Sequence, residues 1–277
     1  MNWFCSALAF GDFVVDCNFM QYAGSSDGLL AASYLEPLAE ALEYQGRIRF
    51  FDMPSNDIPP SVFGARKGTL SGILRSAYLL RKGIKCSVGK DDTLHAPVED
   101  LRWRAICWPY SVNAVRTKKQ NMYNAYCERF GVDPISLLAV NLLKPSSILI
   151  FPDSRQTVKI IPDSTVSMVI AANESVGIST VVVKIRPPGQ QAECEANETS
   201  IWGLKALIEL IKSADAIVSA DSLPVHIATY FKRPIFVFTP VPKVSWPLLP
   251  PSVLIPRFWS GFSEIATYNR WLLTQNV

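Results

Sequence analysis

The sequence predicts an α/β protein of two domains, each built on a parallel sheet. Short apolar runs alternate with segments of helical periodicity, which is the pattern of parallel strands covered by helices on both faces. The 277 residues, 49% of them hydrophobic, are enough for two separate cores. Lys144-Pro145-Ser146 interrupts the pattern and sets the boundary. We therefore expect two Rossmann-like domains, residues 1–143 and 144–277, facing each other across a cleft.

The second half shows the alternation most clearly. Residues 180–185 (TVVVKI) are a β-branched strand, and the apolar residues of 199–213 recur at helical spacing. In chain order we expect strand 147–151, helix 163–176, strand 180–185, helix 199–213, strand 216–219, helix 223–231, strand 235–238, a short strand at 253–255 and helix 262–274.

The first half is less regular but of the same class. An apolar strand over 3–9 stops at Gly11-Asp12, and Ser26 or Asp27 can cap a helix over 29–42. The remaining expected elements are strand 48–51, helix 70–82, strands 84–88 and 104–108, and helix 116–130.

One strand–helix–strand unit is the most informative part of the chain. The strand 216–219 is followed by Asp221 and Ser222, then by helix 223–231 and strand 235–238. Such a unit is a right-handed parallel βαβ. Asp221 and Ser222 therefore fall at the carboxyl edge of the sheet, where open α/β folds bind ligands. The helix N-terminus there suits a phosphate.

Composition and motifs exclude several classes of protein. A formal charge of +3 with scattered basic residues does not indicate nucleic acid. The six cysteines form no CxxC pair and do not cluster with His95 or His226, so we expect free thiols and no zinc. The motifs GxGxxG and GxxxxGK[ST] are absent. No signal peptide or membrane span is visible, which predicts a cytoplasmic protein.

Several motifs in order resemble those of the ADP-heptose:lipopolysaccharide heptosyltransferases, glycosyltransferase family 9. Asp221-Ser222-x-Pro224-x-His226-x-Ala228 resembles the signature D-[ST]-G-x-x-H-x-A. The other similar stretches are Phe10-Gly11-Asp12, Pro152-Asp153-Ser154 with Lys159-Ile160-Ile161-Pro162, and Phe238-Thr239-Pro240. The resemblance covers most of 144–240 and implies the GT-B fold. Leu223 and Thr239 stand where the family has glycine, and Ile161 where it has tryptophan.

The resemblance implies a role for each matched residue. Asp12 would be the general base, and the residues of the donor site would be Ser154, Lys159, Asp221, Ser222, His226 and Thr239. It also implies a nucleotide-sugar donor, first of all an ADP-sugar, and a glycan or glycolipid acceptor. A lipid-linked acceptor would bring the protein to the inner face of a membrane. No DxD pair flanks the site, so we expect transfer without a metal or other cofactor.

The residue types alone leave structural alternatives open for the acids. Asp12 can be a base, or can cap the helix that begins near Phe13. Asp221 can accept hydrogen bonds from sugar hydroxyls or cap the helix over 223–231.

The other candidates have alternatives of the same kind. Lys159 can bind a diphosphate or be a solvated loop lysine. Ser154 can touch phosphate or form a turn, and His226 can be a packing residue.

The function predicted is an inverting glycosyltransferase that moves a sugar, heptose being the candidate, onto a lipopolysaccharide or cell-surface glycan. Two alternatives remain. The three departures from the signature motivate a degenerate relative that binds a nucleotide sugar without transfer. A nucleotide-sugar epimerase on the same fold would need more acidic and histidine groups than the two histidines of this chain provide.

Overall fold

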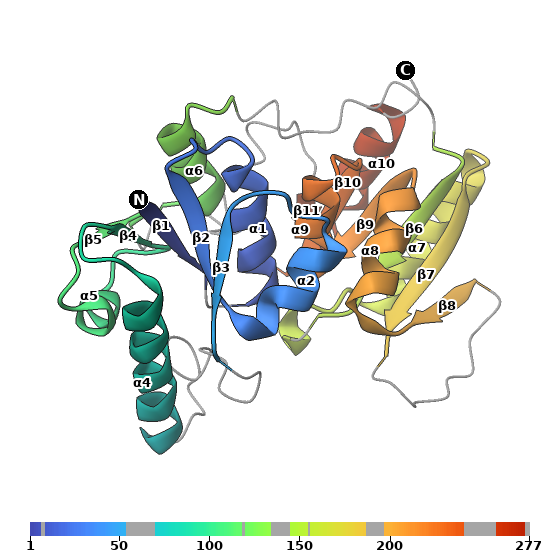
Figure 1. Cartoon of the computed structure of the whole chain (residues 1–277). Helices are drawn as coiled ribbons and strands as arrows, with labels where there is room; N and C mark the ends of the chain where they lie inside the picture. The colour runs from blue at the N-terminus through green and yellow to red at the C-terminus, as the bar shows by residue number, and fades with distance from the viewer. Residues whose placement is uncertain are drawn as a thin grey trace. The chain divides into compact units, whose positions relative to one another are not determined.

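The computed structural model divides into two compact units, Met1–Val132 and Asp133–Val277. It describes residues 1–6, 9–53, 70–117, 120–133, 145–154, 156–186, 197–240 and 259–274. The boundary predicted between residues 143 and 144 falls outside the described residues. Each unit holds one sheet in which every described strand pair is parallel, so the predicted α/β class is confirmed (Figure 1).

The N-terminal unit has a five-stranded sheet in the order β3-β2-β1-β4-β5. Its strands are β1 (Asn2–Ser6), β2 (Asp27–Ala32), β3 (Ile48–Phe51), β4 (Thr93–Ala96) and β5 (Val112–Ala114). Its helices are α1 (Phe10–Met20), a 3-10 turn η1 (Ser33–Leu35), α2 (Glu36–Ala41), α4 (Leu70–Ser87), α5 (Leu101–Cys107) and α6 (Met122–Phe130).

The helix predicted over 29–42 is wrong in its first part. Residues 29–32 belong to β2, which pairs with β1 on one side and β3 on the other. All four side chains, two leucines and two alanines, are fully buried. A central parallel strand is apolar on both faces, and here that tertiary demand overrides the helix propensity of Leu and Ala.

The strands predicted over 84–88 and 104–108 are also wrong, because both segments are helical. Residues 84–87 continue α4, and 104–107 belong to α5. Asp100 caps α5, since its Oδ1 accepts a hydrogen bond of 2.9 Å from Arg102 N–H. The two strands that this part of the chain does form, β4 and β5, lie outside both segments and were not predicted.

The C-terminal unit has a six-stranded sheet in the order β11-β10-β9-β6-β7-β8. Its strands are β6 (Ser147–Phe151), β7 (Ser179–Ile185), β8 (Glu198–Ile201), β9 (Ala216–Ala220), β10 (Ile235–Thr239) and β11 (Trp259–Gly261). Its helices are η4 (Thr157–Lys159), α7 (Asp163–Ser175), α8 (Gly203–Ser213), α9 (Leu223–Tyr230) and α10 (Ile265–Thr274). The predicted strands and helices are otherwise confirmed here within a few residues, but the helix predicted over 199–213 is wrong in its first part, since residues 199–201 belong to β8. Strands β8 and β11 were not predicted. The strand predicted at 253–255 lies outside the described residues.

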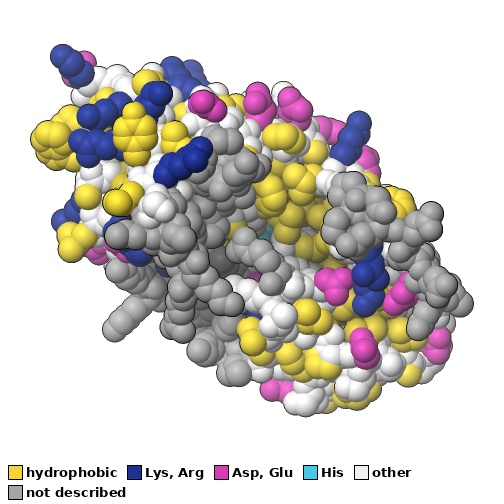
Figure 2. Space-filling view, turned by 90° about the horizontal axis from the view of Figure 1, so that it is seen from below, with side chains coloured by type: hydrophobic (Ala, Val, Ile, Leu, Met, Phe, Trp, Pro, Cys, Tyr) yellow, Lys and Arg dark blue, Asp and Glu magenta, His cyan; other side chains and the backbone are white. Residues whose placement is uncertain are grey.

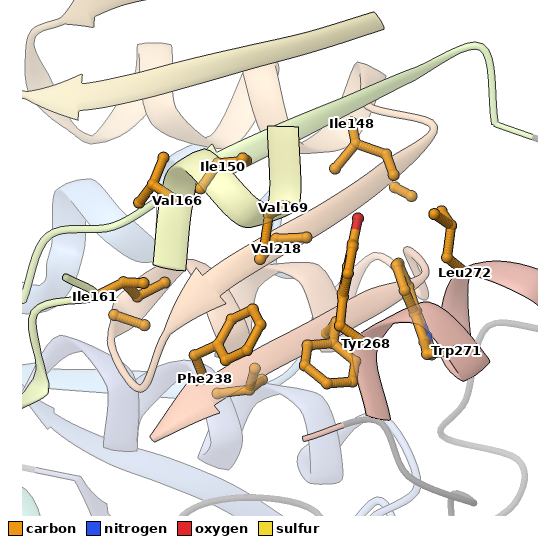
Figure 3. Close-up of a cluster of buried hydrophobic side chains, with 14 of the residues drawn as sticks. Ile148, Ile150, Ile161, Val166, Val169, Val218, Phe238, Tyr268, Trp271 and Leu272 are labelled. Carbon is orange, nitrogen blue, oxygen red and sulfur yellow. The ribbon is translucent and has the colours of Figure 1, made fainter. Parts of the chain in front are cut away.

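A cluster of buried hydrophobic side chains in this unit lies between the sheet and helices α7 and α10 (Figure 3). Tyr268 and Trp271 of α10 pack against Phe236 and Phe238 of β10. The buried hydroxyl of Tyr268 donates a 2.6 Å hydrogen bond to Asn173 Oδ1, so the cluster has its polar group satisfied.

None of the helices within the described residues is long and apolar enough to cross a membrane.

Candidate functional site

The C-terminal sheet has its topological switch point between β6 and β9. The chain leaves β6 to build β7 and β8 on one side, then crosses to β9 and β10 on the other. Ligands of open parallel sheets bind outside the carboxyl ends of the strands at such a point. The segments that leave these ends begin at Pro152 and Asp221, and both contain residues singled out from the sequence.

The loop after β6 folds back on itself and brings Lys159 to this edge. Ile161 N–H donates a 3.0 Å hydrogen bond to Pro152 O, which closes the loop, and the Ile161 side chain is buried in the core. The residue that stands where the motif has tryptophan is therefore part of the core of this unit. Between these anchors Lys159 ends the short helix η4, and its side chain is only 14% exposed.

Lys159 and Asp221 form an ion pair at the switch point. The ammonium Nζ of Lys159 lies 2.5 Å from Asp221 Oδ2, and the side chain of Asp221 is 3% exposed. Neither residue therefore adopts the structural alternative considered above: Lys159 is not a solvated loop lysine, and Asp221 does not cap α9. The cap position is Ser222.

The start of α9 has no side-chain cap among the described residues. The Ser222 hydroxyl donates to Ala220 O at 3.3 Å instead of accepting from a first-turn N–H. Pro224 contributes no N–H, and Val225 N–H donates to Ser222 O at 3.1 Å. The positive end of the helix dipole thus lies directly after the Asp221 carboxylate, and no carboxylate of the helix's own first turn neutralises it.

His226 is buried one turn into α9 and close to the ion pair. Burial is the main reason why its pKa falls to about 4. Asp221 acts to raise that pKa and Lys159 to lower it, so both charges lie close enough to act on the imidazole. At neutral pH His226 is therefore an uncharged ring that donates a hydrogen bond at one nitrogen and accepts one at the other.

Thr239 ends β10 beside this cluster. Phe238 pairs with Ala220, so Thr239 and Asp221 are at the same level of neighbouring strands. Thr239 is fully buried, and its hydroxyl has no hydrogen-bond partner among the described residues. Ser154 lies in the loop after β6, where its hydroxyl oxygen accepts from Gln156 N–H at 3.4 Å, the local turn considered above.

The N-terminal sheet has its own switch point, between β1 and β4. Helix α1 begins close after β1, and Asp12 is in its first turn. Asp12 Oδ2 accepts a 3.1 Å hydrogen bond from Ala9 N–H, which is the reciprocal half of a capping box. The capping alternative is therefore realised. It does not exclude a role as base, because a carboxylate has about four acceptor sites.

A second acid, Asp16, lies one helical turn after Asp12 and was missed by the sequence reasoning. It is 2% exposed, and the hydroxyl of Tyr126 donates a hydrogen bond to its Oδ1. Burial raises its pKa to about 7, the neighbouring hydroxyls of Ser6 and Tyr126 oppose that rise, and the charge of Asp12 adds to it. The i, i+4 spacing is the signal that reveals this pair once the helix is known to begin at Phe10.

Arg116 supplies positive charge to the same cluster and was treated only as one of the scattered basic residues. Burial lowers its pKa, and the carboxylate of Asp12 opposes that effect. Its guanidinium donates to the backbone carbonyls of Thr117 and Gln120 at 3.2 and 3.3 Å.

No group of three His, Cys, Asp or Glu side chains that could hold a metal ion occurs within the described parts of the chain.

Comparisons with known proteins agree with the resemblance noted from the sequence. The family model for glycosyltransferase family 9 (heptosyltransferase) matches residues 69–261, more than half of the chain. The match includes Lys159 and Asp221 and begins after Asp12. A search of curated proteins gives no match.

Solved structures show the fold over the whole chain. The Escherichia coli heptosyltransferase WaaC with ADP has 11% sequence identity and a TM-score of 0.61, with 100% of both chains covered. A family 9 glycosyl transferase of Veillonella parvula has 14% identity and a TM-score of 0.57, covering 100% of this chain and 89% of that one. The E. coli ADP-heptose lps heptosyltransferase II has 13% identity and a TM-score of 0.50, with 99% of each covered. At these identities the likeness establishes the GT-B fold.

Proposed function

The chain belongs to glycosyltransferase family 9, and from this premise we propose that it is an inverting glycosyltransferase. It would move a sugar from a nucleotide diphosphate donor to a lipopolysaccharide or other cell-surface glycan. An ADP-sugar, with heptose as the candidate sugar, is the proposed donor, because the similar E. coli structures are heptosyltransferases and one of them is described with ADP.

The observation that supports donor binding most directly is the Lys159–Asp221 ion pair beside the start of α9. A helix N-terminus contributes about 0.3–1 kcal/mol to an anion, or about 2 kcal/mol when partly buried. A diphosphate needs more than that, and the ammonium of Lys159 provides a full charge already held at the same edge. In the absence of donor, Asp221 neutralises this charge; with donor bound, Lys159 would turn to the diphosphate and Asp221 to the sugar hydroxyls.

Asp12 is the proposed base. Its carboxylate would take the proton of the acceptor hydroxyl as the hydroxyl oxygen forms a bond to the anomeric carbon. The bond from that carbon to the diphosphate oxygen breaks on the opposite face, and the nucleoside diphosphate leaves with its electron pair. Lys159 and the first turn of α9 would stabilise the charge that develops on the leaving oxygen.

Ser154, His226 and Thr239 have supporting roles in the proposal. The neutral ring of His226 and the buried hydroxyl of Thr239 can each make hydrogen bonds to a bound ligand without adding charge. Ser154 belongs to the loop that positions Lys159 and is proposed to contact phosphate. The roles require no metal ion.

A nucleotide-sugar panel tests the proposal. We expect one donor, an ADP-sugar first of all, to raise the melting temperature of the protein in proportion to the logarithm of its concentration, because it binds only the folded state. Adding a glycan acceptor should then release the free nucleotide.

The outcomes separate the alternatives. Donor binding without nucleotide release from any acceptor would favour the degenerate relative, for which Leu223 and Thr239 remain the motivating departures. Formation of an epimeric donor without acceptor would favour an epimerase. Absence of binding by every nucleotide sugar would refute the proposed function.

A further inference from the structure

One solvent-facing side of helix α4 combines large hydrophobic side chains with basic ones. Leu74 is 61% exposed and Tyr78 is 63% exposed, although both are large apolar or aromatic groups. Arg81 and Lys85 follow at positions i+7 and i+11 from Leu74, so the four side chains line one stripe of the helix. Lys82 lies beside the stripe and is exposed. Isolated exposed hydrophobic residues are ordinary, but a stripe of them among basic groups is not.

Trp108, directly after α5, extends this stripe. It is 64% exposed, and the guanidinium carbon of Arg81 lies 5.3 Å from the centroid of its ring. Arg81 also donates a 2.9 Å hydrogen bond from Nη1 to Ala105 O of α5. The arginine therefore holds the tryptophan against the side of α4. We call Leu74, Tyr78, Arg81, Lys82, Lys85 and Trp108 together the α4 face.

The charge of the α4 face is positive and is not neutralised by its own helix. Leu70–Ser87 contains four basic residues and no acidic one. On α5 the basic residues have acidic neighbours, since Arg102 pairs with Asp100 at 2.7 Å and Arg104 lies 3.5 Å from Glu99. Figure 2 shows Lys and Arg side chains gathered among hydrophobic ones on the left of the view, on the side of the N-terminal unit that holds α4 and α5.

We propose that the α4 face binds the surface of a bilayer containing anionic phospholipids. Leucine, tyrosine and tryptophan side chains would enter the boundary between headgroups and acyl chains, and the long Arg and Lys side chains would reach the lipid phosphates. Each basic residue near an anionic membrane strengthens binding roughly fivefold. Burial of the exposed leucine side chain in the bilayer adds a hydrophobic contribution. Charge and apolar area together favour a lipid surface over a nucleic-acid duplex, whose phosphates would bind the basic groups and leave Leu74 exposed.

None of the residues of the α4 face belongs to the donor site, so membrane binding by this face does not depend on donor binding. It extends the proposed function by giving the protein a way to stay at a membrane where a lipid-linked acceptor is found. The two proposals fail separately, since vesicle binding is measured without nucleotide sugar and donor binding without vesicles.

Co-sedimentation of the full chain with vesicles tests the inference. We expect binding to vesicles of phosphatidylethanolamine with phosphatidylglycerol, weaker binding at high salt, and little binding to pure phosphatidylcholine. The variant Lys82→Glu/Lys85→Glu should weaken binding at least about 25-fold, since two charges are removed and reversed. Leu74→Ser/Tyr78→Ser should weaken it about tenfold or more at unchanged charge.

Matched variants in the C-terminal unit serve as controls. Lys205→Glu/Lys232→Glu makes the same charge change at exposed positions, and Leu273→Ser removes a side chain that is 60% exposed. Both should bind vesicles like the wild type, and all variants should keep the wild-type melting temperature because the replaced side chains are on the surface. Equal losses in the control and α4 variants would overturn the inference. So would a loss in the charge variant alone, since that result would show that the apolar side chains of the α4 face take no part in binding the bilayer.

Discussion

The two sheet edges place their buried carboxylates in opposite surroundings. In the C-terminal unit the carboxylate of Asp221 lies 2.5 Å from an ammonium group. In the N-terminal unit the carboxylate of Asp16 accepts a hydrogen bond from the hydroxyl of Tyr126 and has a second carboxylate, Asp12, one turn away. Both lie next to the switch point of a parallel sheet. The same topology thus gives one edge suited to hold an anion and one suited to exchange a proton.

The largest effect is expected at Asp12. Asp12→Asn keeps an oxygen that can accept from Ala9 N–H, so it preserves the helix cap while it removes the base. We expect unchanged donor affinity and turnover at least about a hundredfold lower, since a positioned base contributes roughly 10²–10⁴-fold.

Asp12→Ala separates the two roles of this residue. It removes base and cap together and should lose about 0.5–2 kcal/mol of stability in addition to turnover. If Asp12→Asn turned over donor at nearly the wild-type rate, Asp12 would be a cap only.

The ion pair gives the next largest effect. Replacing Lys159 alone would leave Asp221 buried without its partner, so the informative comparison is between Asp221→Asn and Asp221→Asn/Lys159→Met. ADP should bind the single variant at least as tightly as the wild type, because Lys159 is released from its carboxylate. The double variant should bind ADP at least about tenfold more weakly. Equal ADP affinity in both variants, measured by calorimetry, would show that Lys159 does not bind diphosphate.

Asp16 is expected to make stability fall as pH rises. Its folded pKa, about 7, lies above the ordinary value of 3.8, so the folded state holds the proton more tightly and loses stability between about pH 4 and 7. Asp16→Asn should abolish this loss and be more stable than the wild type at pH 8, by up to about 4 kcal/mol, but not at pH 4. Urea unfolding from pH 4 to 8 measures it, and an unchanged pH dependence in the variant would contradict the assignment.

The buried histidines should act in the opposite direction and more weakly. Both His226 and His95 have pKa values lowered from 6.5 to about 4, so each contributes stability that is lost as pH falls from about 6.5 to 4. Each contributes roughly 3 kcal/mol at most. His226→Gln and His95→Gln, one in each unit, should each remove about half of this acid dependence in urea unfolding. The assignment would fail for whichever variant kept the full dependence.

The C-terminal edge was more predictable from the sequence than the N-terminal edge. In residues 216–239 local signals agree with the fold: β-branched strands, a proline in the first helical turn and a second apolar run predict the βαβ unit that forms. In the N-terminal unit Leu29–Ala32 has the composition of a helix and becomes a strand because β1 and β3 flank it. Only tertiary pairing decides that outcome, so the sequence could not reveal it.

The contacts within each edge were harder to predict than their location. Lys159 and Asp221 were both named from motifs, yet their pairing across 62 positions depends on the loop that Ile161 anchors. Asp16 was overlooked because the helix was expected to begin near Phe13, whereas α1 begins at Phe10 and places Asp12 and Asp16 one helical turn apart. Tyr126, 110 positions away, joins Asp16 only through packing of α6 on α1.

Hydrogen exchange with and without ADP tests the central claim, that the carboxyl edge of β6 and β9 is the donor site. We predict slower amide exchange on ADP binding in residues 156–162 and 220–226, which hold Lys159 and the start of α9, and no comparable change in the matched loop–helix segment 201–206 at the start of α8. ADP binding that left exchange at 156–162 and 220–226 unaltered would contradict the account.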